Sequence, residues 1–288
     1  MTKHADLTQR VQQALSGAPI GTIEYHSGNY GRDEQGRVFY IESAEQREVR
    51  QRIGKQRGEG RKENFVFNVM ENLPFVASTL TSAQCGYLLV LSTYITYEGL
   101  IVKSERDLTP MTQIDMLKAL SLRESQRSTL TDFLTVCMDF GIIRKESEGY
   151  FIADGFHTKG TPPSDRVVRS YITKLREMAS ENKPEQIGFI YKLLPAIHKT
   201  TNMLCENPNE LQPSKVRKLN RKQLAEMAGV SPTYVTTLTG KMTYNGKSVF
   251  AKITTPTDGT FYMLNPAIFR RADRTDYDVT TRGIFGID

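Results

Sequence analysis

The most regular alternation of apolar and polar positions lies between residues 219 and 266. Residues 221–228 have the spacing of a short helix, with Leu224 and Met227 expected to face inward. Residues 229–230, a Gly-Val pair, then supply a tight turn. This segment therefore predicts the first helix and the turn of a helix-turn-helix unit.

A second helix is predicted to begin at Ser231. Serine is a favoured N-cap residue and Pro232 suits the first helical position, so two independent preferences mark the same start. The apolar residues expected to face the core at helical spacing are Val235, Leu238 and Met242. The residues left for the outer face are polar, small or basic: Thr233, Tyr234, Thr236, Thr237 and Lys241.

A β-hairpin is predicted after this second helix. Residues 248–253 and 260–264 alternate apolar and polar side chains, and residues 255–259 contain an Asp-Gly turn signal. A helix, a turn, a helix and a hairpin in this order make a winged helix, whose second helix is shaped to enter the major groove of DNA. The alternative is a winged helix used only for protein contacts, but the polar and basic outer face favours DNA.

A second copy of the pattern lies about a hundred residues earlier, as a search for internal repeats reveals. Residues 108–120 resemble the first helix, residues 121–122 the turn and residues 125–140 the second helix. Gly141 suits the C-terminal end of that helix. The apolar residues expected on one face of it are Leu130, Phe133, Leu134, Cys137 and Met138. The hairpin strands of this copy are predicted at residues 142–145 and 150–153.

Each copy also has a long apolar helix upstream, at residues 82–96 and 185–204, which is expected to form the core. Pro195 is expected to kink or divide the second of these helices. The sequence thus predicts a mainly α fold with small β wings, of the α+β class, built from tandem winged helix-turn-helix domains.

The segment between the two copies begins with a break at residues 160–163, Gly-Thr-Pro-Pro. Ser164 or Asp165 then suits the start of a linker helix. The inward stripe predicted for this helix is Val168, Tyr171, Ile172, Leu175 and Met178 or Ala179. Such a helix could bridge the two domains or pair with its mate in a homodimer, and the sequence leaves both possibilities open.

The first sixty residues follow a different pattern. Residues 7–15 predict a short amphipathic helix, and residues 21–25 and 36–41 a small β-hairpin around a polar loop at residues 27–35. Residues 45–63 are basic and interrupted by glycine, which is typical either of an arm that contacts phosphates or of a solvated linker. The predicted domains are residues 1–63, 64–160 (first winged helix), 161–182 (linker helix), 183–272 (second winged helix) and 273–288 (tail).

Composition narrows the class of protein further. The 288 residues carry a formal net charge of +6 and a sequence pI of about 9.1, which weakly favours a polyanionic partner. The chain has no apolar run long enough to span a membrane, and its polar N-terminus does not resemble a signal peptide. The cysteines Cys85, Cys137 and Cys205 are expected to be buried free thiols in a reducing cytoplasm.

No catalytic pattern is evident, so we expect a protein without enzymatic activity, cofactor or metal. The four histidines stand alone, without the His-x-His pair and carboxylate of a metal-dependent nicking site. The chain also lacks the Gly-x-x-x-x-Gly-Lys-Ser/Thr loop of nucleotide-hydrolysing motors and the Gly-x-Ser-x-Gly turn of hydrolases. His157 and His198 are expected to be structural or surface residues.

The predicted contacts to double-stranded DNA divide into those to bases and those to phosphates. In the second winged helix the base contacts are assigned to Thr233, Tyr234, Thr236 and Thr237, because threonine can touch the thymine methyl group and exchange hydrogen bonds with base edges. The phosphate contacts are assigned to Lys241, Arg217, Lys218, Arg221 and Lys222, and Lys252 on the wing to a phosphate or to the minor groove. In the first winged helix the candidates are Arg123, Ser125, Gln126, Arg127 and Thr129, with Arg144 and Lys145 on the wing.

The second winged helix is similar to the RepL-type replication proteins of Firmicute plasmids and their phage-borne relatives. The similarity rests on residues 222–231 and on residues 259–269, where an aromatic-Met-aliphatic-Asn-Pro run closes the wing and Phe269 follows. It covers about 80 residues from near Glu185 onward, and the first winged helix and basic arm depart from the family pattern. The resemblance implies a replication role, and tandem winged helices also occur in initiators of theta-replicating plasmids.

We therefore expect a sequence-specific DNA-binding protein of phage or plasmid type, acting as replication initiator or transcriptional regulator. The two winged helices in one chain would raise the overall affinity if their spacing fits the site. The alternative is a protein-interaction module that docks on host replication or transcription proteins. A nuclease or recombinase is disfavoured, because no carboxylates cluster around a nucleophile.

Overall fold

The computed structural model describes residues 64–162, 164–271 and 279–287, and three short strands before them. The chain divides into two compact units, Met1–Lys62 and Glu63–Asp288. In the first unit, β1 (Ile23–Tyr25), β2 (Tyr30–Asp33) and β3 (Val38–Tyr40) form an antiparallel sheet in the order β1-β2-β3. The predicted two-stranded hairpin is therefore wrong, because part of its polar loop forms the central strand. The predicted helix at 7–15 and the basic arm at 45–63 lie outside the described residues.

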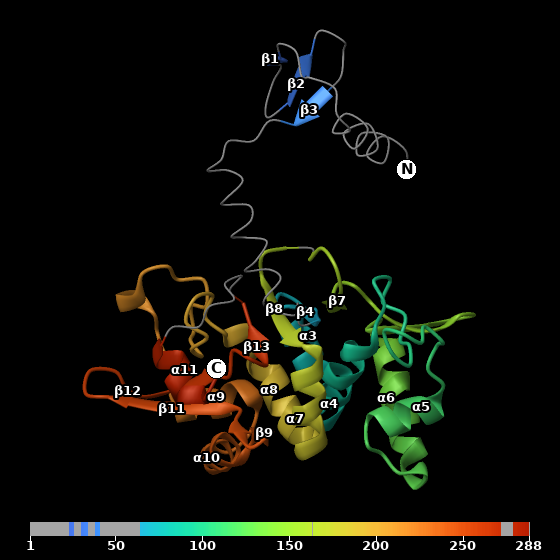
Figure 1. Ribbon diagram of the computed structural model, residues 1–288. Coiled ribbons are helices and arrows are strands. Elements are labelled where there is room, and N and C mark those ends of the chain that lie inside the picture. The colour runs from blue at the N-terminus through green and yellow to red at the C-terminus, as the bar shows by residue number, and fades with distance from the viewer. Residues whose placement is uncertain are drawn as a thin grey trace. The chain divides into compact units, whose positions relative to one another are not determined.

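The second unit is an α+β structure with small antiparallel sheets, in which one order of elements occurs twice (Figure 1). The first half contains β4 (Phe65–Val69), α3 (Leu73–Thr79), α4 (Ser82–Leu91), η1 (Ser92–Tyr94), α5 (Gln113–Ala119), η2 (Glu124–Gln126), α6 (Arg127–Asp139), β5 (Ile143–Glu146), β6 (Gly149–Ile152) and β7 (His157–Thr158). The second half contains β8 (Val167–Tyr171), α7 (Ile172–Glu181), α8 (Pro184–Leu193), η3 (Leu194–Ala196), η4 (Pro213–Lys215), α9 (Arg221–Ala228), α10 (Pro232–Lys241), β9 (Thr243–Tyr244), β10 (Lys247–Ser248), β11 (Phe250–Thr255), β12 (Gly259–Leu264) and β13 (Phe269–Arg270).

The two halves share a four-stranded sheet in the order β13-β8-β4-β7. The starts of β4 and β8, of α4 and α8, and of η1 and η3 are each separated by 102 residues. In the central antiparallel pair β4–β8, the equivalent residues Phe67 and Arg169 lie opposite each other. An antiparallel pair centred on equivalent residues is what a local two-fold axis produces. The repeat seen in the sequence is therefore also a symmetric packing of one half against the other.

Helices α4 and α8 meet across the same local two-fold axis. A Cβ atom added at Gly86 would overlap the backbone oxygen of Pro184, and one added at Gly188 would overlap that of Ser82. Gly86 is equivalent to Gly188, and Ser82 to Pro184, so the contact is reciprocal, as in an isologous dimer interface. The two helix backbones touch because glycine has no side chain to hold them apart.

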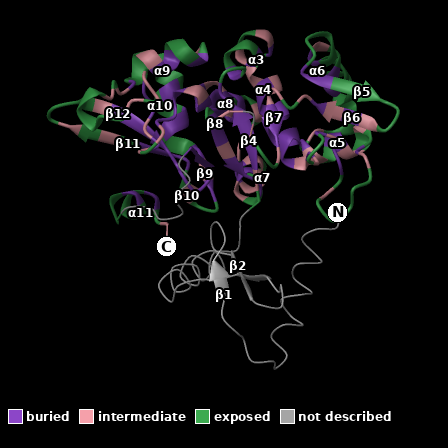
Figure 2. Cartoon of the chain, turned by 90° about the horizontal axis from the view of Figure 1, so that it is seen from above, coloured by how far each residue is buried: buried purple, intermediate pink, exposed green. Residues whose placement is uncertain are grey.

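A continuous core runs through both halves of the second unit. Figure 2 shows buried residues concentrated along α4, α8, β4 and β8, with exposed residues at the outer hairpins β5–β6 and β11–β12. Within the described residues, no helix is long and apolar enough to cross a membrane. The three cysteines predicted as buried free thiols are confirmed as such. In the predicted tail, α11 (Val279–Phe285) buries Phe285.

The predicted linker helix is wrong in its first part. Residues 167–171 form the strand β8, and a helix begins only at Ile172. The residues Val168, Tyr171, Ile172, Leu175 and Met178 are buried as predicted, whereas Ala179 is only partly buried. The strand forms because β4 and β13 supply hydrogen-bonding partners on both sides, and β-branched and aromatic residues suit that position. This segment is thus part of the shared core.

Other predicted elements extend too far. The first helix of the early copy starts at Gln113, and Leu108 is exposed. The helix predicted from residue 185 ends at Leu193 and continues only as the 3-10 turn η3, because Pro195 has no N–H to donate to the preceding turn of the helix. His198 therefore follows a helix instead of lying in one. Met138 and Met227 were predicted to face inward but are exposed, since neighbouring residues on their helices fill the core positions.

Candidate nucleic-acid interface

Local interactions fix the geometry of α9 and α10. The Asn220 side chain caps α9, and Gly229 adopts a left-handed conformation with φ 67° that turns the chain toward α10. The Ser231 hydroxyl then accepts a hydrogen bond from the Tyr234 backbone N–H at 3.2 Å, and Pro232 occupies the first turn. The helix boundaries predicted from the sequence are confirmed.

The outer face of α10 is open to solvent, as predicted. Val235, Leu238 and Met242 are buried, which leaves the predicted base-contact residues and Lys241 exposed. The hydroxyl of Thr236 donates to the Pro232 carbonyl at 3.3 Å, and that of Thr237 donates to the Thr233 carbonyl at 3.2 Å. Because their protons are used within the helix, these hydroxyls offer lone pairs and γ-methyl groups to a ligand.

Basic residues lie on α10 and on the adjacent elements α9 and β11, although α9 also carries the exposed Glu226. Among the described residues, no carboxylate lies within ion-pair distance of Lys222, Lys241 or Lys252, all of which are exposed. Arg221 donates from Nη1 to the Thr236 hydroxyl at 3.3 Å and so lies directly beside α10. Helix α10 contains no acidic residue. The face therefore combines small polar side chains with cations that are available to a polyanion.

Two predicted phosphate contacts have partners within the protein. Arg217 forms an ion pair with Glu206 at 3.0 Å. Lys218 donates to Asp258 at 2.6 Å and lies over the Phe261 ring at 4.5 Å, so it fastens the hairpin turn to the segment before α9. The same hydrogen bond is the main reason that the pKa of Asp258 is lowered. Lys218 thus helps to hold the hairpin β11–β12, whereas Lys222, Lys241 and Lys252 have no acidic partner among the described residues.

The corresponding face of the first half is more mixed. Arg123, Ser125, Arg127 and Thr129 are exposed at the start of α6 as predicted. The Gln126 side chain, however, accepts from the Arg123 backbone N–H at 3.0 Å, so it caps the helix as well as facing solvent. On the wing, Arg144 pairs with Glu146 at 3.0 Å, and Lys145 lies over the Tyr150 ring at 5.6 Å. Fewer cations are free here.

The two histidines considered in the sequence are both buried. His157 lies between Asn68 and Tyr191 in the shared core. His198 donates from Nε2 to the carbonyl of Glu210, 2.7 Å away, and its Nδ1 accepts from the Thr201 hydroxyl, 2.9 Å away, and from the Thr201 backbone N–H. Each ring therefore has a structural role. Among the described residues, no group of three or more His, Cys, Asp or Glu side chains could hold a metal ion.

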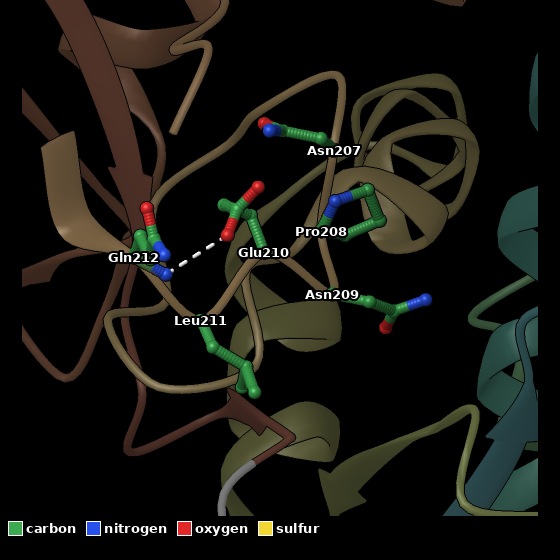
Figure 3. Close-up of a pocket in the computed structure, with 6 residues that line it drawn as sticks. All are labelled: Asn207, Pro208, Asn209, Glu210, Leu211 and Gln212. Carbon is green, nitrogen blue, oxygen red and sulfur yellow. Dashed lines mark hydrogen bonds between the residues drawn. The ribbon is translucent and has the colours of Figure 1, made fainter. Parts of the chain in front are cut away.

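The surface recess of the second half does not provide a chemical site. Its volume is about 550 Å³, and Figure 3 shows that the six lining residues, 207–212, all belong to one loop. Arg271 fixes this loop through hydrogen bonds to the Pro208 carbonyl and the Asn209 side chain at 2.9 and 2.8 Å. The side chains of Asn207 and Asn209 and one carboxylate oxygen of Glu210 are used in hydrogen bonds within the protein, so few polar groups of the lining are left for a ligand.

No protein-family model matches the chain, and neither a curated protein nor a solved structure is similar to it at a significant level.

Proposed function

We propose that the protein binds double-stranded DNA in a sequence-specific manner through two winged helices. The observation that carries the proposal is the outer face of α10, where small polar side chains and Lys241 are exposed and Lys222 and Lys252 lack acidic partners in the described chain. A helix of this kind suits the width of the major groove. The resemblance of the second half to RepL-type proteins favours a replication initiator or transcriptional regulator of a mobile element.

In this proposal α10 reads the bases and its neighbours hold the backbone. The γ-methyl groups of Thr236 and Thr237 would contact thymine methyls, while their lone pairs would accept from exocyclic amines. Arg221 and Lys222, at the start of α9, and Lys252, on the wing, would contact phosphates on either side of the groove. Arg217 and Lys218 contribute less, because their charges already face Glu206 and Asp258.

The local two-fold axis adds a requirement on the DNA. Both views of the molecule place α6 and α10 on opposite flanks of the α4–α8 pair, as a local two-fold axis requires (Figures 1 and 2). Two reading helices related in this way approach half-sites of opposite orientation on one face of a duplex. The half-sites need not be identical, because the residues of α6 and α10 differ.

The test is a selection from randomised duplex DNA with the full chain, followed by footprinting on the element that encodes it. We expect enrichment of one bipartite site with oppositely oriented halves. Repeats of that site in a replication origin would support initiation, and a promoter location would support regulation. Failure to enrich any sequence, with weak and salt-insensitive binding to random DNA, would refute the proposal.

Lys241→Ala is expected to weaken binding to every DNA sequence alike. Removing one phosphate contact lowers the slope of log K against log salt by about one unit, because one fewer counterion is released. The measurement is fluorescence anisotropy over a range of salt concentrations. Lys199→Ala removes the same charge from a side chain paired with Asp165 and should leave the slope unchanged. A common slope for both variants and the wild type would contradict the assignment.

Changes at Thr237 are expected to alter sequence preference instead. Thr237→Ser keeps the hydroxyl and removes the methyl group, so it should relax discrimination for thymine by about 1 kcal/mol. Thr237→Val keeps the methyl group and removes the hydrogen-bond acceptor. It should therefore change the preference at the base whose exocyclic amine donates to this hydroxyl, and leave the preference for thymine unchanged. Comparing both variants on single-base variants of the selected site checks this, and identical profiles would contradict a base contact.

A further inference from the structure

We infer that three phenylalanines of the first half form a docking site for a short basic and apolar segment of another protein. Phe75 on α3 and Phe140 after α6 are 46% and 52% exposed, and Phe156 is partly buried beside them. The Phe75 ring lies 6.2 Å from the ring of Phe140 and 6.2 Å from that of Phe156, between their centroids. We call these three residues the phenylalanine patch.

The second half shows that the fold does not need aromatic rings at this place. Leu73 and Val76 on α3 correspond to Leu175 and Met178 on α7 by their common separation of 102 residues and their burial, so Phe75 corresponds to Glu177. Instead of a ring contact, the Glu177 carboxylate accepts a hydrogen bond from the Asn245 side chain at 2.7 Å.

Asn245 also occupies the place of Phe140. The backbone N–H of Ile142 donates to Cys137 at the end of α6, and that of Val249 donates to Met242 at the end of α10. Each of these bonds joins the end of a helix to the start of the hairpin that follows. The residues enclosed by them, 138–141 and 243–248, are therefore equivalent connections. In the second half, this connection contacts α7 through the polar pair Glu177–Asn245. In the first half, it contacts α3 through the two half-exposed rings of Phe75 and Phe140. An exposed aromatic cluster without a structural necessity indicates a binding surface.

The size and the surroundings of the patch define the partner. Half-exposed phenylalanines offer roughly 100 Å² each, which is far below the roughly 800 Å² per partner of a stable protein dimer. A short segment with one or two apolar anchors fits this area better than a second copy of the chain. Acidic residues adjoin the patch in the chain: Asp139 and Asp154 are exposed within two residues of Phe140 and Phe156 and have no ion-pair partner among the described residues. A segment with Lys or Arg beside the anchor complements these carboxylates.

The patch is separate from the proposed DNA contacts. Those of the first half lie at the start of α6, whereas Phe140 follows its last residue, Asp139. A helix of 13 residues is about 20 Å long. The patch can therefore accept a protein segment whether or not DNA is bound, and the inference does not depend on the proposed function.

The test is a selection of random displayed peptides against the full chain, with Phe75→Glu/Phe140→Asn as the counter-target. This double variant copies the polar pair of the second half and is therefore expected to fold, which a thermal melt checks. We expect peptides with an aliphatic or aromatic residue flanked by Lys or Arg, whose affinity falls by about tenfold or more in the variant. Leu211→Ser, which removes a 76% exposed apolar side chain elsewhere, should not change binding.

Asp139→Asn/Asp154→Asn keeps the rings and removes the two carboxylate charges, so it should weaken the same peptides and reduce the salt dependence of their binding. This variant keeps the inference testable if the double phenylalanine variant does not fold. Three results would overturn the inference: no enriched peptide, enriched peptides that bind wild type and variants alike, or self-association of the wild type that the phenylalanine substitutions abolish. The last of these would identify a second copy of the chain as the occupant.

Discussion

Gly188→Ala is expected to destabilise the second unit by roughly 3 kcal/mol or more. The added methyl group would overlap the backbone oxygen of Ser82 on α4, and backbone cannot move aside as a flexible side chain can. The helices α4 and α8 would have to separate, which would open the core that both halves share. Gly86→Ala should have a similar effect, because its methyl group would meet the equivalent oxygen of Pro184. Urea denaturation followed by circular dichroism measures both.

Gly240→Ala is the matched control for this substitution. Gly240 also lies within a helix, α10, but no atom lies within 4 Å of the position where a Cβ would be added. Alanine is the better helix former, so this variant should be more stable than the wild type by about 0.5–1 kcal/mol. If Gly188→Ala proved as stable as Gly240→Ala, the close approach of α4 and α8 would be wrong, and with it the symmetric packing of the two halves.

Much of the local structure could be predicted because its signals lie within a few residues of one another. The start of α10 is set by Ser231 and Pro232, and the turn before it by Gly229, all neighbours in the sequence. The hairpin β11–β12 follows from alternation and an Asp-Gly turn. The outer face of α10 could be predicted for the same reason, since helical spacing alone separates the buried from the exposed positions.

Structure that depends on distant partners could not be predicted in this way. Residues 167–171 have an apolar pattern that suits a helix, and only the pairing with β4, about a hundred residues away, makes them a strand. The close approaches of Gly86 to Pro184 and of Gly188 to Ser82 depend on the packing of α4 against α8, which no local pattern specifies. The charges of the candidate site could not be predicted fully for the same reason. The ammonium group of Lys218 is paired with the carboxylate of Asp258, which lies forty residues further along the chain. A count of basic residues therefore overestimates the number of cations that are free to bind a polyanion.

His157 is expected to make the second unit lose stability in mild acid. The ring is fully buried, and burial lowers its pKa from the usual 6.5 to about 3. Its two nitrogens already have partners that suit the neutral form. The Asn68 amide nitrogen donates to Val168 and Ser170, so its oxygen faces Nδ1, 3.0 Å away, and accepts a hydrogen bond from the Nδ1–H of the ring. Nε2 lies 3.1 Å from the Tyr191 hydroxyl, which donates to it.

The direction of the pH effect follows from where the proton binds. Above pH 6.5 the ring is neutral in both the folded and the unfolded chain, and the stability is fully present. As the pH falls below 6.5, the unfolded chain takes up the proton and the folded chain does not, until the pH approaches 3. The free energy of unfolding should therefore fall by about 1.4 kcal/mol per pH unit, or about 3 kcal/mol between neutrality and pH 4.

Two substitutions separate titration of this ring from a general loss of packing. His157→Gln cannot be protonated, so it should lower stability at neutral pH but remove most of the decline between pH 6.5 and 4. Tyr191→Phe removes the hydroxyl beside Nε2 and should cost about 1–3 kcal/mol, while the decline with acid persists because the ring remains buried. Urea denaturation at a series of pH values measures all three proteins. Equal slopes for the wild type and His157→Gln would mean that other groups cause the acid sensitivity, and would exclude His157 as its origin.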